Sequence, residues 1–368
     1  MTTTTTGYNP DLVPTGMEGG VDTNALPWIE TPQAPGWRIK PLRASRESGV
    51  FSAIVGLDAG VALRPAVHLG ATDLFVLSGR MRYTQEPLAA TIETGTWGYI
   101  PANARIEGLE VDEETELLMN FFGPVAFLGA DGHSVTSILT ALDIQAAAQA
   151  NGLALVPNTL AECMVPRPQN SVLAPAPLRI TEHAANQLLM TAENQTEGAT
   201  THPHFVDTRA FDFFSNPNRP GFGIKVLRVS EETGHVSMII RHIGVAGPHF
   251  HLGAGDFLVI NGRIGYRAGP PEGYGSGVWF YEPAGARHEA TQQLGDEDLI
   301  YTANIYGPIQ FDDGPGTPIT TVSSWMQYKA TAEIAGTPMV ANVFEGDTSL
   351  LAWAPLGSDA AASKGAVR

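Results

Sequence analysis

Three histidines in the second half of the chain have the type and spacing of a metal site. His249 and His251 stand two residues apart in the stretch GPHFHLGAGDFLVINGRIGY, residues 247–266. On a β-strand this spacing puts both side chains on one face. His288 ends the stretch GVWFYEPAGARH, residues 277–288, whose Pro-Ala-Gly favours a tight turn into a further strand. Three imidazoles suit a divalent metal and leave open positions for substrate, water or O2.

The histidine stretch has an earlier copy in the chain. Residues 64–83 read RPAVHLGATDLFVLSGRMRY and share the HLGA core, the apolar run and the Gly-Arg-x-x-Tyr ending. VDTNA at 21–25 returns as VDTRA at 206–210, and FFGP at 121–124 returns as IYGP at 305–308. The spacing stays close to 184 positions throughout. The sequence therefore predicts that a whole domain was duplicated.

The two copies differ at the metal-ligating positions. Ala66 stands where the second copy has His249, and Ile106 stands where it has His288. Only His68 is kept. One histidine cannot hold a metal with useful affinity. We therefore expect the first unit to be a metal-free copy with a structural or docking role.

A carboxylate could complete the site. The candidates are Glu282, Asp256 and Glu272, and a site of three histidines without a carboxylate is the alternative. Glu282 is preferred because the first unit has Ile100 in its place, lost together with the histidines. Its other role would be to orient a metal ligand by hydrogen bonding. Both roles make Glu282 a candidate catalytic residue.

Arg263 and Tyr266 are two further candidate catalytic residues, because they are expected on strands next to the metal-binding face, where alternation turns half of the side chains inward. Arg80 and Tyr83 occupy the same slots in the first unit, which equally fits a role in barrel packing. The same reading applies to the repeated aromatic pairs Trp97–Tyr99 and Trp279–Tyr281.

Short apolar runs separated by Gly, Pro, Asn and Asp at intervals of about 8–12 residues predict an all-β barrel or sandwich in each unit. Helices are expected after each barrel, at 141–152 and 323–337, with a short one at 181–192. We expect a mobile N-terminus, a first barrel, a bridge, a metal-binding barrel and a C-terminal tail, at residues 1–20, 21–155, 156–205, 206–345 and 346–368. The bridge holds another His-x-His, formed by His202 and His204, for which we expect a loop role.

Composition excludes several classes of partner. The chain has 368 residues and a formal net charge of −17, which argues against binding to nucleic acid or to anionic membranes. It has one cysteine, so no disulfide can form within the chain. The first residues lack the features of a secretory signal, and no apolar run reaches the roughly 18 residues of a membrane span. We therefore expect a cytoplasmic protein without a membrane partner.

The order His-x-His, strand, Gly-x5-Pro-x-Gly-x-x-His resembles the two motifs of the cupin superfamily. Two such units imply a bicupin, with two tandem double-stranded β-helix (jelly-roll) barrels and short accessory helices. The motifs VDTxA, IKxLR and Tyr-Glu-Pro-Ala-Gly-x-x-His make the chain similar to the 2,4'-dihydroxyacetophenone dioxygenase and acetylacetone-cleaving enzyme group. Gly255 and Asp256 stand where cupins usually have a Glu ligand. The resemblance implies Fe(II) on His249, His251 and His288, with Zn, Ni, Mn and Cu as alternatives.

The resemblance also implies a nonhaem Fe(II) dioxygenase that splits a C–C bond with O2. Its substrate would be a small hydroxyketone or β-diketone that chelates the metal. Two alternatives stay open: a Zn or Ni cupin acting as isomerase, lyase or hydrolase, and a non-catalytic cupin sensor or binding protein. The expected partners are the small-molecule substrate, O2 and a second copy of the chain in a homodimer.

Overall fold

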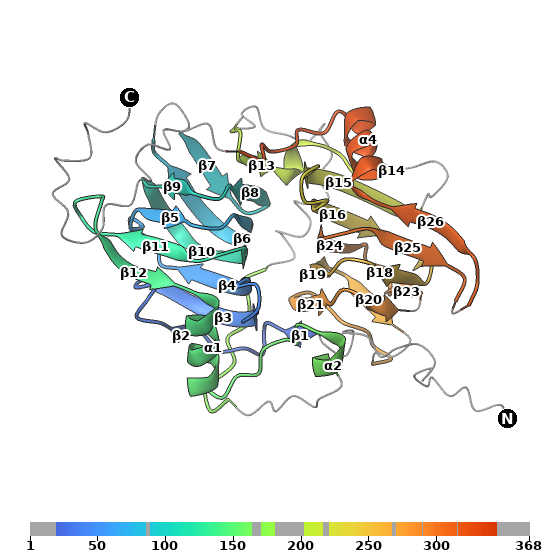
Figure 1. Cartoon of the computed structure of the whole chain (residues 1–368), viewed down its shortest axis with the longest axis horizontal. Helices are drawn as coiled ribbons and strands as arrows, with labels where there is room; N and C mark the ends of the chain where they lie inside the picture. The colour runs from blue at the N-terminus through green and yellow to red at the C-terminus, as the bar shows by residue number, and fades with distance from the viewer. Residues whose placement is uncertain are drawn as a thin grey trace.

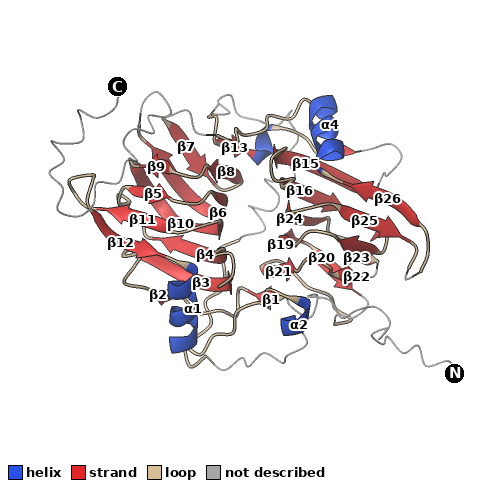
Figure 2. Cartoon of the chain, viewed as in Figure 1, coloured by secondary structure: helices blue, strands red, loops and turns tan. Residues whose placement is uncertain are grey.

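Each half of the chain forms a β-barrel in the computed structural model, and the two barrels lie side by side (Figure 1). The structure describes residues 20–85, 89–163, 171–180, 202–215, 221–266, 270–288, 290–314 and 316–343. Strands dominate both halves, and the few helices lie at the outside (Figure 2). The predicted class, all-β with tandem jelly-roll barrels and short accessory helices, is confirmed.

The first barrel consists of two antiparallel sheets whose apolar faces enclose one core. The larger sheet runs in the order β13 (Phe205–Asp207), β8 (Thr96–Ile100), β6 (Thr72–Tyr83), β10 (Leu109–Phe121), β4 (Phe51–Leu57), β3 (Trp37–Ala44) and β2 (Ile29–Glu30), with β7 (Ala90–Glu93) paired to β6. The smaller sheet runs in the order β12 (Val135–Leu139), β11 (Val125–Leu128), β5 (Ala66–His68) and β9 (Ala104–Ile106).

The second barrel repeats this plan with three sheets. The largest runs in the order β1 (Val21–Asp22), β21 (Val278–Glu282), β19 (Gly255–Asn261), β24 (Leu299–Ile305), β16 (Val236–His242), β15 (Phe222–Val229) and β14 (Phe214–Ser215). Two smaller sheets complete the barrel. One runs in the order β17 (Val245–Ala246), β23 (Thr291–Leu294) and β20 (Arg263–Tyr266). The other runs in the order β22 (Arg287–His288), β18 (His249–His251), β25 (Ile309–Asp312) and β26 (Ile319–Ser323).

One helix follows each barrel, as predicted. These are α1 (Ala141–Ala150) and α4 (Trp325–Ala335), and each begins at a capping box. Gly336 ends α4 in the left-handed region, with φ 66°, which glycine adopts without strain. Within the described ranges, the further helical segments are a single turn, α2 (Leu160–Cys163), and the 3-10 turn η3 (Thr208–Ala210). The helix expected at 181–192 and most of the two predicted terminal segments lie outside the described residues. Among the residues that the structure describes, every helix is too short or too polar to cross a membrane.

The two halves exchange their first strands. β1, from the start of the chain, pairs with β21 of the second barrel, where Val21 lies opposite Trp279. β13, which opens the second half, pairs with β8 of the first barrel, where Val206 lies opposite Trp97. The repeated VDTxA motif is therefore the segment by which each half extends a sheet of the other (Figure 1).

Buried cations from the repeated IKxLR motif hold the exchanged segments. The Lys40 ammonium donates to the Thr23 carbonyl at 2.8 Å, and the Lys225 ammonium donates to the Thr208 carbonyl at 2.7 Å. Burial lowers the pKa of both lysines to about 8. A lysine this deeply buried is tolerated because the carbonyl replaces part of its hydration.

The arginines of the same motif cross between the barrels. The Arg43 guanidinium lies 3.8 Å from the centre of the Tyr281 ring, and the Arg228 guanidinium lies 3.7 Å from the centre of the Tyr99 ring. Such cation–π contacts gain strength where water is excluded. Around them, one continuous apolar core draws its members from both barrels, including Trp97 at 3 % and Trp279 at 0 % exposure. The repeated aromatic pairs are therefore interface residues.

Two aspartates meet in this interface. Asn120 Nδ2 donates to Asp73 at 2.9 Å and reaches Asp256 of the other barrel at 3.5 Å. Asp256 also accepts from Asn304 at 3.2 Å and from the Tyr306 hydroxyl. One oxygen of Asp73 is buried with no hydrogen-bond partner among the described residues. Burial raises the pKa of Asp256 to about 6, and burial together with Asp256 raises the pKa of Asp73 well above its usual range.

We expect Asp73→Asn to stabilise the protein at neutral pH. The folded chain retains a carboxyl proton that the unfolded chain releases above about pH 4. Asp256 therefore reduces stability as the pH rises from about 4 to about 6, and Asp73, whose pKa is raised as well, reduces it in the same direction. Removing one of them should raise the free energy of unfolding at pH 7 by about 1–2 kcal/mol, with a smaller gain at pH 4. Urea unfolding of both proteins across this range measures the difference.

Asp58→Asn is the matched control, because the Asp58 side chain is 69 % exposed and pairs only at the surface with Arg38. It should change stability by less than about 1 kcal/mol. Equal or lower stability of Asp73→Asn at pH 7 would show that the two carboxyls do not oppose each other.

Candidate metal centre

β18 carries two of the predicted ligands into the second barrel. It is the inner strand between β22 and β25, so it is held by hydrogen bonds on both edges. His249 and His251 lie two residues apart on it, and their rings are 5.1 Å apart between centroids. Both line the same cavity, as the period of a strand requires. This arrangement is the one predicted, with both imidazoles on one face of the strand.

His249 has the hydrogen bond that a metal ligand needs. Its Nδ1 lies 3.0 Å from the Gly247 carbonyl oxygen. A carbonyl can only accept, so Nδ1 carries the proton and Nε2 keeps its lone pair. A backbone carbonyl on the second ring nitrogen commonly orients a metal-binding imidazole in this way.

His251 faces a buried carboxylate. Its Nε2 lies 2.5 Å from Glu282 Oε2, and the two side chains are 4 % and 1 % exposed. Glu282 ends β21 directly opposite Gly255 of β19. A Cβ at Gly255 would already come within 3.4 Å of the His251 ring. The bare glycine thus leaves room for a carboxylate that arrives from the neighbouring strand.

The backbone places residue 288 opposite His249. β22 pairs antiparallel with β18, and His249 and His288 are register partners. The side chain of His288 lies outside the described part of the structure. Among the side chains that are described, no group of three or more His, Cys, Asp or Glu has the arrangement of a metal site.

The histidines and Glu282 stand in a cavity of about 760 Å³. Its walls are mainly apolar and aromatic, with contributions from Phe214, Phe222, Met238, Ile240, Phe257, Ile264, Ile305 and Phe311. Tyr266 and Tyr301 also line it. Burial and the nearby Glu282 raise the pKa of both phenols, so both remain protonated at neutral pH. A few polar groups in an apolar chamber are typical of a small-molecule site.

The other predicted residues lie elsewhere. The Arg263 guanidinium donates to the carbonyls of Glu272 and Gly273, at 2.6 and 2.9 Å, and the side chain is exposed. Glu272 is exposed as well. The suggestion that Asp256 could be a ligand is wrong, because Asp256 points into the interface between the barrels while its neighbour Phe257 faces the cavity.

In the first barrel, apolar side chains occupy the space that corresponds to the cavity of the second barrel. Its β5 and β9 keep the same register, with Ala66 opposite Ile106. His68 Nδ1 is hydrogen-bonded to Thr72 at 2.7 Å, and burial lowers the pKa of His68 to about 4. Its core includes a stack of Phe51 on Phe121, with ring centroids 4.4 Å apart. The second barrel has Val236 and Ile305 at the positions of these two phenylalanines.

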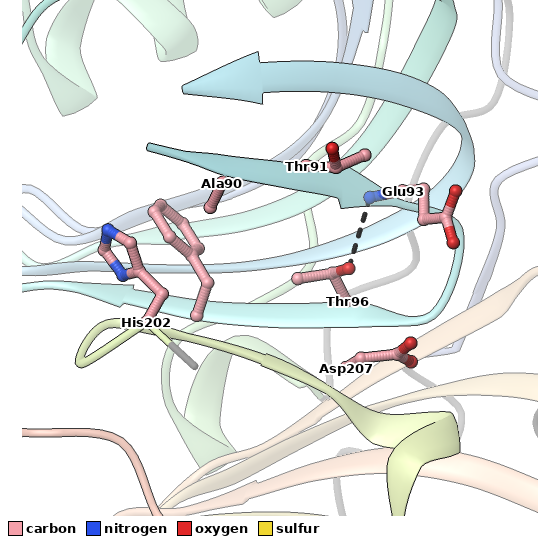
Figure 3. Close-up of a pocket in the computed structure, with 7 residues that line it drawn as sticks. Ala90, Thr91, Glu93, Thr96, His202 and Asp207 are labelled. Atoms are coloured by element: carbon pink, nitrogen blue, oxygen red, sulfur yellow. Dashed lines mark hydrogen bonds between the residues drawn. The ribbon is translucent and has the colours of Figure 1, made fainter. Parts of the chain in front are cut away.

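The second His-x-His belongs to a turn. His202 Nδ1 accepts a hydrogen bond from the His204 backbone at 3.0 Å, and burial lowers the pKa of His202 to about 4. His202 lines a small pocket of about 140 Å³ against β7 and β8, with Glu93 and Asp207 toward its other end (Figure 3). Both carboxylates are bound by Arg209, so they are not available to a cation.

Comparison with known proteins identifies the family of the chain. A sequence profile of the ChrR cupin-like domain matches residues 17–126 and 201–306, which is more than half of the chain and covers most of each barrel. The chain belongs to the ChrR cupin-like family. Because the family domain occurs twice in tandem, this member is a bicupin of the cupin superfamily.

Three relatives of this cupin are each similar to about one barrel of it. The acetylacetone-cleaving enzyme of Acinetobacter johnsonii is 25 % identical over 119 residues, which cover 32 % of this chain and 78 % of the relative. A solved structure from Methylibium petroleiphilum, provisionally named an acetylacetone dioxygenase, is 31 % identical over 34 % of this chain and 91 % of its own, with a TM-score of 0.32. The acetylacetone dioxygenase structure from Acinetobacter johnsonii is 23 % identical over 35 % of this chain and 88 % of its own, with a TM-score of 0.31.

Tyr301 is one of the polar cavity residues that the sequence reasoning missed. A comparison of the two copies could have found it, because β24 and β10 have the same register and Leu117 stands in its place in the first barrel. Tyr301 thus differs between the copies in the same way as His249 and Glu282 do.

We expect His249→Ala to abolish metal binding, because it removes an imidazole from a site with few other donors. Elemental analysis of the purified protein should fall from about one metal ion per chain to near zero. His202→Ala is the matched control and should retain the metal. Full metal content in His249→Ala would exclude the β18 site.

Proposed function

We propose that this cupin is a nonhaem Fe(II)-dependent dioxygenase that cleaves a C–C bond of a small hydroxyketone or β-diketone. The supporting observation is the convergence of two imidazoles and a buried carboxylate at one wall of a mainly apolar cavity. The proposal also draws on the relatives, since one is named an acetylacetone-cleaving enzyme and another an acetylacetone dioxygenase.

The donor set suits a divalent metal. His249 offers the lone pair of Nε2, because its Nδ1 donates to the Gly247 carbonyl. His251 lies beside it, and in the proposal His288, whose backbone is opposite His249, completes the set. When bound, Fe(II) would supply Lewis acidity for two chelating substrate oxygens and the redox chemistry that O2 requires.

Glu282 would act as the general base that removes a proton from the substrate. The carbon between two carbonyl groups is acidic, and in this proposal Glu282 Oε2 accepts its proton as the enolate forms. Burial of Glu282 at 1 % exposure keeps water away from this step. If the carboxylate instead only orients His251 through the 2.5 Å contact, its loss would weaken metal binding rather than turnover.

The cavity would exclude water and select the substrate by shape. Its apolar lining favours a substrate with hydrocarbon or aromatic groups beside the chelating oxygens. Cleavage would place one atom of O2 in each of two products. The acyl carbon at the broken bond would become a carboxylic acid, and its neighbour would become an aldehyde from a β-diketone or a second carboxylic acid from a hydroxymethyl ketone. The first barrel would take no part in the chemistry and would serve as the second wall of the shared core.

Oxygen uptake tests the proposal. Purified protein supplied with acetylacetone or 2,4'-dihydroxyacetophenone should consume O2 with at least one of them, lose this activity after chelation, and regain it with ferrous iron but not with zinc. Turnover without O2 consumption would instead identify a metal-dependent isomerase, lyase or hydrolase. Oxygen uptake that persists unchanged after complete metal removal would contradict the proposal.

We expect Glu282→Gln to retain the metal and to lower kcat by about 100-fold, the usual effect of removing a general base. Glu272→Gln is the matched control, because that side chain is exposed. Metal content and oxygen uptake are measured on the same samples. A variant that loses iron in proportion to activity would show that Glu282 acts as a ligand or orients one.

A further inference from the structure

The duplication offers a comparison within one molecule. Both barrels keep the same strand register, so each cavity position of the second barrel has a counterpart in the first. A residue needed only for the shape of a barrel should have a counterpart of the same polarity in the other copy. Residues needed for chemistry should be lost from the first barrel, which has lost two of the predicted ligands.

Tyr266 and Tyr301 give opposite results in this comparison. Tyr266 has Tyr83 as its counterpart, so its phenol is kept where the histidines are absent. Tyr301 has Leu117, an apolar residue of the first barrel's core. The change from phenol to hydrocarbon accompanies the change from Glu282 to Ile100.

Tyr301 lies where its hydroxyl can serve a ligand. It is on β24 between β16 and β19, and its ring packs 5.6 Å from the Phe257 ring, centroid to centroid. It lines the cavity near enough to Glu282 for the carboxylate to raise its pKa. The Tyr83 and Tyr306 hydroxyls donate to Gln85 and Asp256, whereas the Tyr301 hydroxyl makes no hydrogen bond within the described part of the chain.

An unused hydroxyl in an apolar cavity is costly unless a ligand or water satisfies it. We propose that Tyr301 is a substrate-binding residue, whose hydroxyl donates a hydrogen bond to the substrate oxygen beside Glu282. This inference rests on the proposed function, since it assumes that an oxygen-rich chelating substrate enters this cavity. A neutral donor at this position favours an enolate over its neutral ketone, because hydrogen bonds to charged acceptors are the stronger ones.

Tyr301→Phe tests the inference, because it removes only the hydroxyl. Iron-loaded protein is titrated with acetylacetone and with 2,4'-dihydroxyacetophenone under anaerobic conditions, and heat release gives Kd. We expect affinity for the compound that the wild type binds to fall about tenfold or more, with iron content unchanged. Tyr83→Phe, the same change in the first barrel, is the matched control and should bind as tightly as the wild type.

Two results would overturn the inference in distinguishable ways. Equal affinity of Tyr301→Phe and the wild type would remove Tyr301 from the site while leaving the proposed function intact. Failure of the iron-loaded wild type to bind either compound would contradict the proposed function and this inference with it. Tyr301→Leu, which installs the residue of the first barrel, should reproduce the loss seen with Tyr301→Phe.

Discussion

The structure depends on the core that the two barrels share. Trp97 and Trp279 are almost fully buried, and each lies on a strand that pairs with a strand from the other half of the chain. Both belong to an apolar core that takes its members from both barrels. Burial of such large apolar surfaces is the dominant favourable contribution to folding, so the shared core stabilises both barrels.

The shared core gives the first barrel a role that does not require the histidines missing from β5 and β9. The repeated VDTxA and IKxLR motifs supply the exchanged strands, the buried lysines and the arginines that stack on tyrosines, and all of these serve the interface. The first barrel can therefore lose its ligands and fill its cavity with Phe51 and Phe121 while its interface stays intact. Selection on the interface and selection on the cavity act on opposite faces of the same strands.

The sequence predicted the local features well. The spacing of His249 and His251 determines that they share a face, and turn residues mark the strand ends because their backbone preferences are local. The direction of Asp256 and the position of Tyr301 were not predictable in this way. Both depend on which distant strand pairs with β19 or β24 and in which register, and no short stretch carries that information. The exchange of strands escaped prediction for the same reason, since either barrel offers a suitable edge.

The exchanged strand also has a consequence for biosynthesis. The Thr23 hydroxyl bonds to a carbonyl 254 residues further along the chain. At the usual speed of translation, roughly 5–20 residues per second, β1 must wait roughly ten seconds or more for its partner to emerge from the ribosome. β13 has no such delay, because the strand that it joins is already synthesised. The first barrel can therefore close while the second is still being synthesised, and β1, although synthesised before it, pairs only later with β21.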